Sequence, residues 1–134
     1  MSTQFRFPSR CFRLVALCCG LFAWLPSAVA HEIRPAYLEI KESAADRYDV
    51  LWRTPINAGM RLPVLLKFPA EVRNVAEPGQ REVADSLVER REIEVPGGLA
   101  GKRIEFVGLQ ATITDVFVRV EMRDGRRATT IIHP

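Results

Sequence analysis

Two histidines, His31 and His133, are the side chains of this sequence best suited to bind a metal ion. If the chain is cut before His31, that residue offers both an imidazole and a free α-amine, whose reference pKa values are about 6.5 and about 7.7 to 8.0. Such nitrogen donors suit Cu(II) or Ni(II), and Glu32 would add an oxygen. We therefore name His31, Glu32 and His133 as candidate copper or nickel ligands. The alternative is that His31 is an ordinary chain end and His133 an exposed strand-end residue.

Other residues that could act in catalysis or ligand binding are better explained by structural roles. Asp115 could act as a ligand or base, but an aspartate that begins a strand more often accepts a hydrogen bond in a turn, which we favour. Gly97, Gly98 and Gly101 precede no helix that would aim amide groups at a phosphate, so they indicate a tight connection with positive φ. Ser43 and Ser86 are the only serines after residue 30, and both lie in loop contexts. Without a catalytic motif, we expect no enzyme activity.

The first 30 residues have the layout of a cleavable secretory signal. Arg6, Arg10 and Arg13 form a positive start, and residues 14–25 form an apolar stretch that is shorter than the about 20 residues of a membrane span. The small residues at 28–30 suit a signal peptidase. The sequence therefore predicts a signal peptide at 1–30 and one extracytoplasmic, periplasmic domain at 31–134.

Removal of this leader changes the charge and the cysteine content. Three of the 19 basic residues lie in the leader and all 16 acidic residues follow it, so the remaining chain carries 16 of each and is formally neutral. No basic patch remains, and we expect no binding of nucleic acid. The three cysteines, Cys11, Cys18 and Cys19, also lie in the leader. The domain must then be stabilised by a packed core without disulfides.

Alternating apolar and polar residues predict short strands and no helix. The predicted strands cover residues 37–41, 48–52, 64–68, 87–95, 102–107, 116–123 and 126–132, and residues 71–85 are predicted to be loop. Tyr48 and Trp52 share one face and could line a ligand groove, although core positions are the better interpretation. Arg90 and Arg91 are predicted to lie on a solvated face. This pattern predicts an all-β fold, a small antiparallel β-sandwich of Greek-key, Ig-like type.

The last hairpin is the sharpest local prediction. Asp124-Gly125 lies between two alternating runs and suits a type I′ turn. That turn pairs Val118 with Ile131, Val120 with Thr129, and Phe117 with Ile132. Residues 126–132 would then form an edge strand that is open to pairing, so a homodimer is expected through this edge.

Three segments together resemble a known family. They are residues 31–38 (HEIRPAYL), residues 96–101 (PGGLAG), and residues 108–119 (Gly108-Leu109 followed by TDVFVR). In this order they are similar to the extracytoplasmic N-terminal region of bacterial HupE/UreJ-like membrane proteins. The resemblance implies an interaction or accessory module for a membrane-embedded, metal-transport-like partner, either a separate protein or a membrane domain encoded beyond Pro134. Nickel transport is not implied for this chain, because the resemblance does not include the membrane core.

Overall fold

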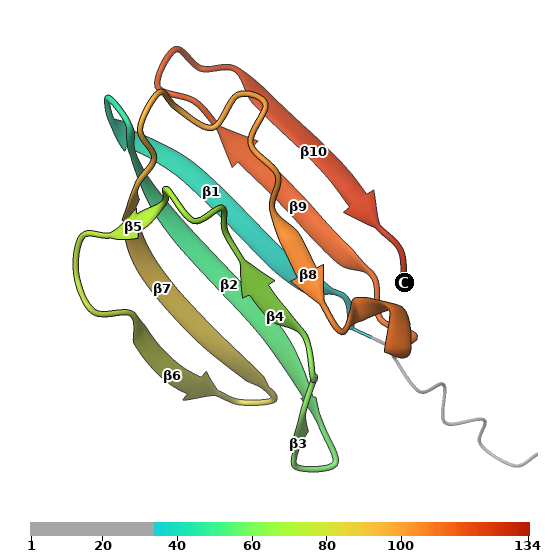
Figure 1. Ribbon diagram of the computed structural model, residues 1–134. Helices are drawn as coiled ribbons and strands as arrows, with labels where there is room; N and C mark the ends of the chain where they lie inside the picture. The colour runs from blue at the N-terminus through green and yellow to red at the C-terminus, as the bar shows by residue number, and fades with distance from the viewer. Residues whose placement is uncertain (1–33) are drawn as a thin grey trace, which may run out of the picture. The chain divides into compact units, whose positions relative to one another are not determined.

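The computed structural model describes residues 34–134, and these residues form two β-sheets (Figure 1). The predicted leader, together with His31 and Glu32, lies outside the described residues. Within the described part, no helix is long and apolar enough to cross a membrane. The elements are β1 (Ala36–Ala44), β2 (Arg47–Asn57), β3 (Met60–Arg61), β4 (Leu65–Lys67), β5 (Arg73–Asn74), β6 (Gly79–Val83), β7 (Ser86–Glu94), β8 (Glu105–Val107), the 3₁₀ helix η1 (Leu109–Ala111), β9 (Val116–Glu121) and β10 (Arg127–Ile132).

The large sheet has the strand order β10-β9-β1-β2-β7-β5, with β3 paired to β2 and β6 paired to β7. β1 and β9 run parallel, with Ala36 beside Val116, whereas the other pairs are antiparallel. The small sheet consists of β4 and β8. The predicted all-β, sandwich-like fold is therefore confirmed, and the parallel β1–β9 pair is an addition that the antiparallel prediction did not contain.

One face of the large sheet packs against the small sheet and forms the core. Because side chains alternate along a strand, β1 directs Leu38 and Ile40 inward and β2 directs Tyr48, Val50 and Trp52 inward, all buried. The Trp52 and Phe106 rings, one from each sheet, have centroids 5.7 Å apart. Tyr48 and Trp52 are thus core residues, as predicted, and do not line a groove for a ligand.

The prediction of loop over residues 71–85 is wrong in part, because β5 and β6 lie there. Both strands pair with β7. Every residue of β5 and β6 is exposed, so neither strand needs the alternation of apolar residues that identifies a half-buried strand. The tight β6–β7 turn contains Ala84 at a φ of 52°.

The loop at residues 97–101 has the backbone conformation that its glycines predict. Gly97, Gly98 and Gly101 have φ values of 76°, 78° and 74°, a region that side chains disfavour. The loop is anchored on the core, because the Leu99 amide donates a hydrogen bond of 3.3 Å to the Tyr48 hydroxyl.

The predicted register of the last hairpin is wrong by one residue. The structure pairs Ile131 with Phe117, Thr130 with Val118 and Ala128 with Val120. Gly125 has a φ of 85°, whereas Asp124 has no positive φ, so the type I′ turn, which needs both, is absent. Instead, Met122 donates its N–H to Arg126, and Gly125 donates to Met122. This pattern is typical of a three-residue loop with glycine in the left-handed region.

Candidate interaction surface on the outer face of the large sheet

The large sheet has an outer face, opposite the small sheet, that no strand or helix of residues 34–134 covers (Figure 1). Cross-strand registers order its side chains into rows, because directly paired residues of neighbouring strands point to the same side. We call one of these rows the aromatic row. Its members are Ile131 (β10), Phe117 (β9), Tyr37 (β1), Arg53 (β2) and Val88 (β7).

The aromatic row is held together by ring contacts. The rings of Tyr37 and Phe117 are stacked, with centroids 5.8 Å apart and an interplanar angle of 9°. The Arg53 guanidinium lies 5.6 Å from the centroid of the Tyr37 ring, a distance that allows a cation–π interaction. The Tyr37 hydroxyl donates a 2.6 Å hydrogen bond to Glu39, which fixes the ring on the sheet. The result is a preorganised patch of aromatic and cationic groups.

Ile131 belongs to this row because of the three-residue loop. A shift of one residue in register moves a side chain to the other face of a sheet. In the predicted register Ile131 would face Val118 on the core side, but in the structure it faces Phe117 and is 51% exposed. The outer face therefore gains an exposed aliphatic side chain that the sequence-based register places in the core.

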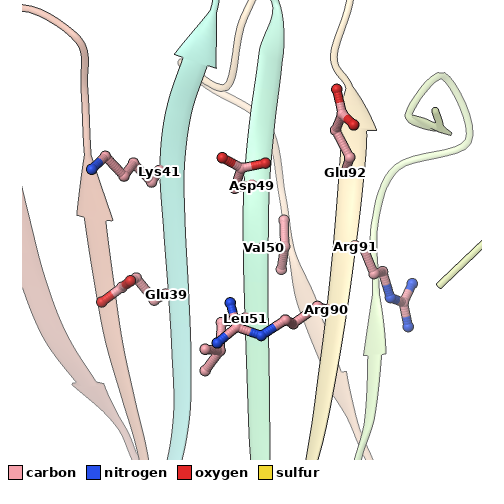
Figure 2. A pocket seen from close by; sticks show the side chains of 8 residues that line it. All are labelled: Glu39, Lys41, Asp49, Val50, Leu51, Arg90, Arg91 and Glu92. Atoms are coloured by element: carbon pink, nitrogen blue, oxygen red, sulfur yellow. The ribbon is translucent and has the colours of Figure 1, made fainter. Parts of the chain in front are cut away.

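The other half of the outer face is charged and forms a shallow hollow of about 390 Å³ (Figure 2). Lys41 and Glu39 rise from β1, Asp49 and Leu51 from β2, and Arg90 reaches from β7 toward Leu51. None of the ion pairs found in residues 34–134 involves Lys41, Asp49 or Arg90.

The phenol of Tyr37 provides a spectroscopic probe of this surface. Burial raises the pKa of Tyr37 above its ordinary value of 10.0, and the hydrogen bond to Glu39 and the charge of Glu39 raise it further. Because the protonated form is favoured in the folded state, this contribution to stability is present below pH 10 and is lost as the pH rises through the raised pKa.

We expect Tyr37 to titrate above pH 10.0 in a tyrosinate absorbance titration. Tyr48→Phe removes the only other tyrosine and isolates the signal. Glu39→Gln should move the Tyr37 pKa back toward 10.0, because it removes the carboxylate charge. If the pKa of Tyr37 in the Tyr48→Phe protein were 10.0 or lower, this result would contradict the hydrogen bond between Tyr37 and Glu39.

The structure places one predicted metal ligand, His133, next to Asp115. His133 Nδ1 lies 2.9 Å from Asp115 Oδ1, and the histidine side chain is 72% exposed. The Asp115 carbonyl accepts a hydrogen bond from Ala36, and its carboxylate binds His133, so the predicted turn role for its side chain is wrong. Within residues 34–134, no group of three or more His, Cys, Asp or Glu residues could hold a metal ion.

Arg91 is not on a solvated face, contrary to the prediction for the Arg90-Arg91 pair. Successive residues of β7 point to opposite faces, so Arg90 is outward and Arg91 inward (Figure 2). Arg91 forms an ion pair with Glu89, whose side chain is only 10% exposed, and Gln80 donates a 2.7 Å hydrogen bond to the second carboxylate oxygen. The three side chains form a polar cluster beneath the small sheet.

The aromatic row is absent from the predictions that the sequence supports, although one feature of the sequence indicates it. Tyr37 and Phe117 occupy the outward positions of strands whose inward positions are Leu38 and Val116 or Val118, so each strand carries an aromatic residue on its solvent side. Both side chains are half-buried, and aromatic residues on the solvent side of a strand are of the type enriched at protein interfaces. Comparisons with protein families, with curated proteins and with solved structures found no match for this chain.

Proposed function

We propose that this chain is a non-catalytic extracytoplasmic interaction or accessory module that binds a membrane-embedded protein through the aromatic row. The single observation that carries the proposal is the stacked Tyr37–Phe117 pair, with Arg53 and the exposed Ile131 beside it, on a sheet face that no other described element covers. Aromatic residues and arginine are the types enriched at energetic centres of protein interfaces.

The arrangement of the outer face supports a protein partner over a small ligand. The aromatic row is part of a broad sheet surface, whereas small-molecule sites are concave and mostly apolar. Lys41, Asp49 and Arg90 flank it with charges of both signs, and such charges set the orientation and specificity of an encounter. An apolar centre with a polar margin is the usual anatomy of a protein interface.

The membrane association of the partner and the extracytoplasmic location are proposed from the sequence. The first 30 residues have the layout of a secretory signal, and the three quoted segments resemble the extracytoplasmic region of HupE/UreJ-like membrane proteins. Both features favour a module that works at the outer side of a membrane, beside a metal-transport-like protein.

Site-specific photocrosslinking in the producing cells tests this proposal. A photoreactive residue at Arg53, on the outer face, should form a covalent adduct with an integral membrane protein. The same residue at Lys67, which is 67% exposed on the small sheet, should not. Phe117→Ala, added to the protein that carries the photoreactive residue at position 53, should reduce the adduct yield about tenfold or more. Loss of a central aromatic side chain weakens binding by about 2 kcal/mol or more. Lys41→Ala, a control in the charged half, should change it less than about threefold.

Equal adduct yields from positions 53 and 67, or an unchanged yield with Phe117→Ala in a folded protein, would contradict the use of the aromatic row. An adduct only with proteins outside the membrane fraction would contradict a membrane-embedded partner.

A second candidate function is that of a soluble periplasmic copper- or nickel-binding protein that uses His31, with Glu32 and His133 as further ligand candidates. The observation that favours it is the His133–Asp115 pair. When Nδ1 carries the proton and donates to the carboxylate, Nε2 keeps its lone pair for a metal, and carboxylates orient metal-binding histidines in this way.

Calorimetry with Cu(II) and Ni(II) tests the metal-binding candidate. The protein processed before His31 should bind one equivalent, and one extra residue ahead of His31 should abolish this binding because it removes the free α-amine from that residue. His133→Ala, with Asp115 retained, tests whether the second histidine contributes. Equal binding by the processed and extended forms would contradict a site built on the amine of His31.

A further inference from the structure

Among the residues that the structure describes, β10 forms an unprotected edge of the large sheet. It pairs with β9, and no strand of residues 34–134 pairs with its other side. Natural edge strands are protected by charged residues, prolines or bulges. β10 reads RATTII, with a single charge at its first position, no proline and no bulge in its pairing with β9. By contrast, β6, which pairs only with β7, carries Gly79 and the adjacent charges Arg81 and Glu82.

The hairpin geometry identifies which backbone groups of β10 face the open edge. Met122 donates its N–H to the Arg126 carbonyl, so the carbonyl of residue 126 points toward β9. Peptide groups alternate in direction along an antiparallel strand. Arg127, Thr129 and Ile131 therefore present their N–H and C=O groups to the open edge, and Ala128, Thr130 and Ile132 bond to β9.

We propose that β10 pairs with β10 of a second copy of this chain, antiparallel, about a two-fold axis perpendicular to the sheet at Thr129. In this register Thr129 exchanges hydrogen bonds with the partner's Thr129. Arg127 lies opposite the partner's Ile131. The three residues whose backbone groups face the open edge meet the same three residues of the second copy. The interface is therefore self-complementary, as a two-fold contact requires.

The side chains of this register are compatible on both faces. Arg127, Thr129 and Ile131 all lie on the outer face, which the axis keeps on the same side in both copies. One side of the exposed Ile131 then packs against the aliphatic stem of the partner's Arg127, while its other side remains next to Phe117 in the aromatic row. Arg127 already bonds to Glu121 at 3.3 Å, and no like charges lie opposite each other. On the inner face the small residue Ala128 lies opposite the partner's Thr130.

This pairing joins two copies into one continuous sheet and sets two aromatic rows on one surface. The dimer would present its membrane partner with two binding surfaces, but the edge pairing itself does not depend on that partner. Self-association is measured on the purified protein alone, so its failure leaves the photocrosslinking result unaffected.

Sedimentation analysis and hydrogen exchange of the protein, purified as the producing cell exports it, test the inference. We expect a monomer–dimer equilibrium with a dissociation constant below about 1 mM. The amides of Arg127, Thr129 and Ile131 should exchange more slowly at high protein concentration, where the dimer forms, than at low concentration. Thr129→Pro removes the middle one of the three N–H groups that face the open edge and leaves the hydrogen bonds to β9 in place, so it should abolish the dimer. Thr129→Val, which keeps the N–H and the β-branched shape, should retain it.

A protein that remains monomeric up to about 1 mM would overturn the inference, as would a dimer in which those three amides exchange as fast as in the monomer. A folded Thr129→Pro protein that dimerises like its parent would also overturn it. If Thr129→Pro does not fold, the exchange measurement on the parent protein decides alone.

Discussion

Replacement of Gly108 by alanine is expected to lower the free energy of unfolding by about 2 to 5 kcal/mol. Gly108 has a φ of 92°, and a Cβ at this position would lie 2.5 Å from the carbonyl oxygen of Pro63. The left-handed conformation costs a residue with a side chain about 1 to 2 kcal/mol, and the overlap with the backbone adds about 1 to 3 kcal/mol. Gly108 precedes η1 and packs directly against the backbone of Pro63, which lies ahead of β4. Because the clash is with a backbone atom, no rotamer change can relieve it.

Gly125→Ala is the matched control for this prediction. Gly125 has a similar φ of 85°, but nothing lies within 4 Å of the position that a Cβ would take there, so only the conformational cost of about 1 to 2 kcal/mol applies. Urea denaturation of both variants separates steric overlap from backbone strain. Equal losses of stability in the two variants would show that the Pro63 contact yields without cost.

The amino-acid sequence predicts the strands that have one buried face and misses those that have none. β1 and β2 alternate buried and exposed residues, so the pattern of apolar residues locates them. β6 is exposed along its whole length. Its place in the sheet depends on backbone pairing with β7, and such pairing does not require an alternation of apolar residues. The turn glycines at 97, 98 and 101 are predictable because positive φ restricts the choice of residue.

The aromatic row depends on long-range pairing that local patterns do not determine. Tyr37 and Phe117 come together because β1 and β9 pair in parallel, and no local signal specifies which strands become neighbours. Ile131 reaches the row only because Gly125 closes a three-residue loop, although the same Asp-Gly pair also suits the two-residue turn that the sequence predicts. The half-buried strands are therefore predictable, whereas the surface that they build together is not.

Replacement of Glu89 by alanine is expected to lower the free energy of unfolding by about 3 kcal/mol, because it breaks a largely buried ion pair. The Glu89 side chain is 10% exposed and that of Arg91 is 21% exposed, with its guanidinium 6.0 Å from the centroid of the Phe68 ring. Without Glu89, the guanidinium and the Gln80 amide both lose their hydrogen-bond acceptor. Glu92→Ala is the control on the same strand: its ion pair with Arg47 is exposed, and its loss should cost less than about 1 kcal/mol.

The double variant Glu89→Leu, Arg91→Leu distinguishes the cost of an unpaired charge from the net value of the pair. An apolar replacement of both partners is often neutral, because the energy needed to remove two charges from water offsets their attraction. We therefore expect the double variant to be more stable than Glu89→Ala, despite carrying one substitution more. Denaturant unfolding of the parent and these variants measures the difference. If the double variant were the less stable of the two, the Glu89–Arg91 pair would contribute stability that apolar contacts with Trp52 and Phe68 cannot replace, and the polar cluster would be a net stabilising feature of the core.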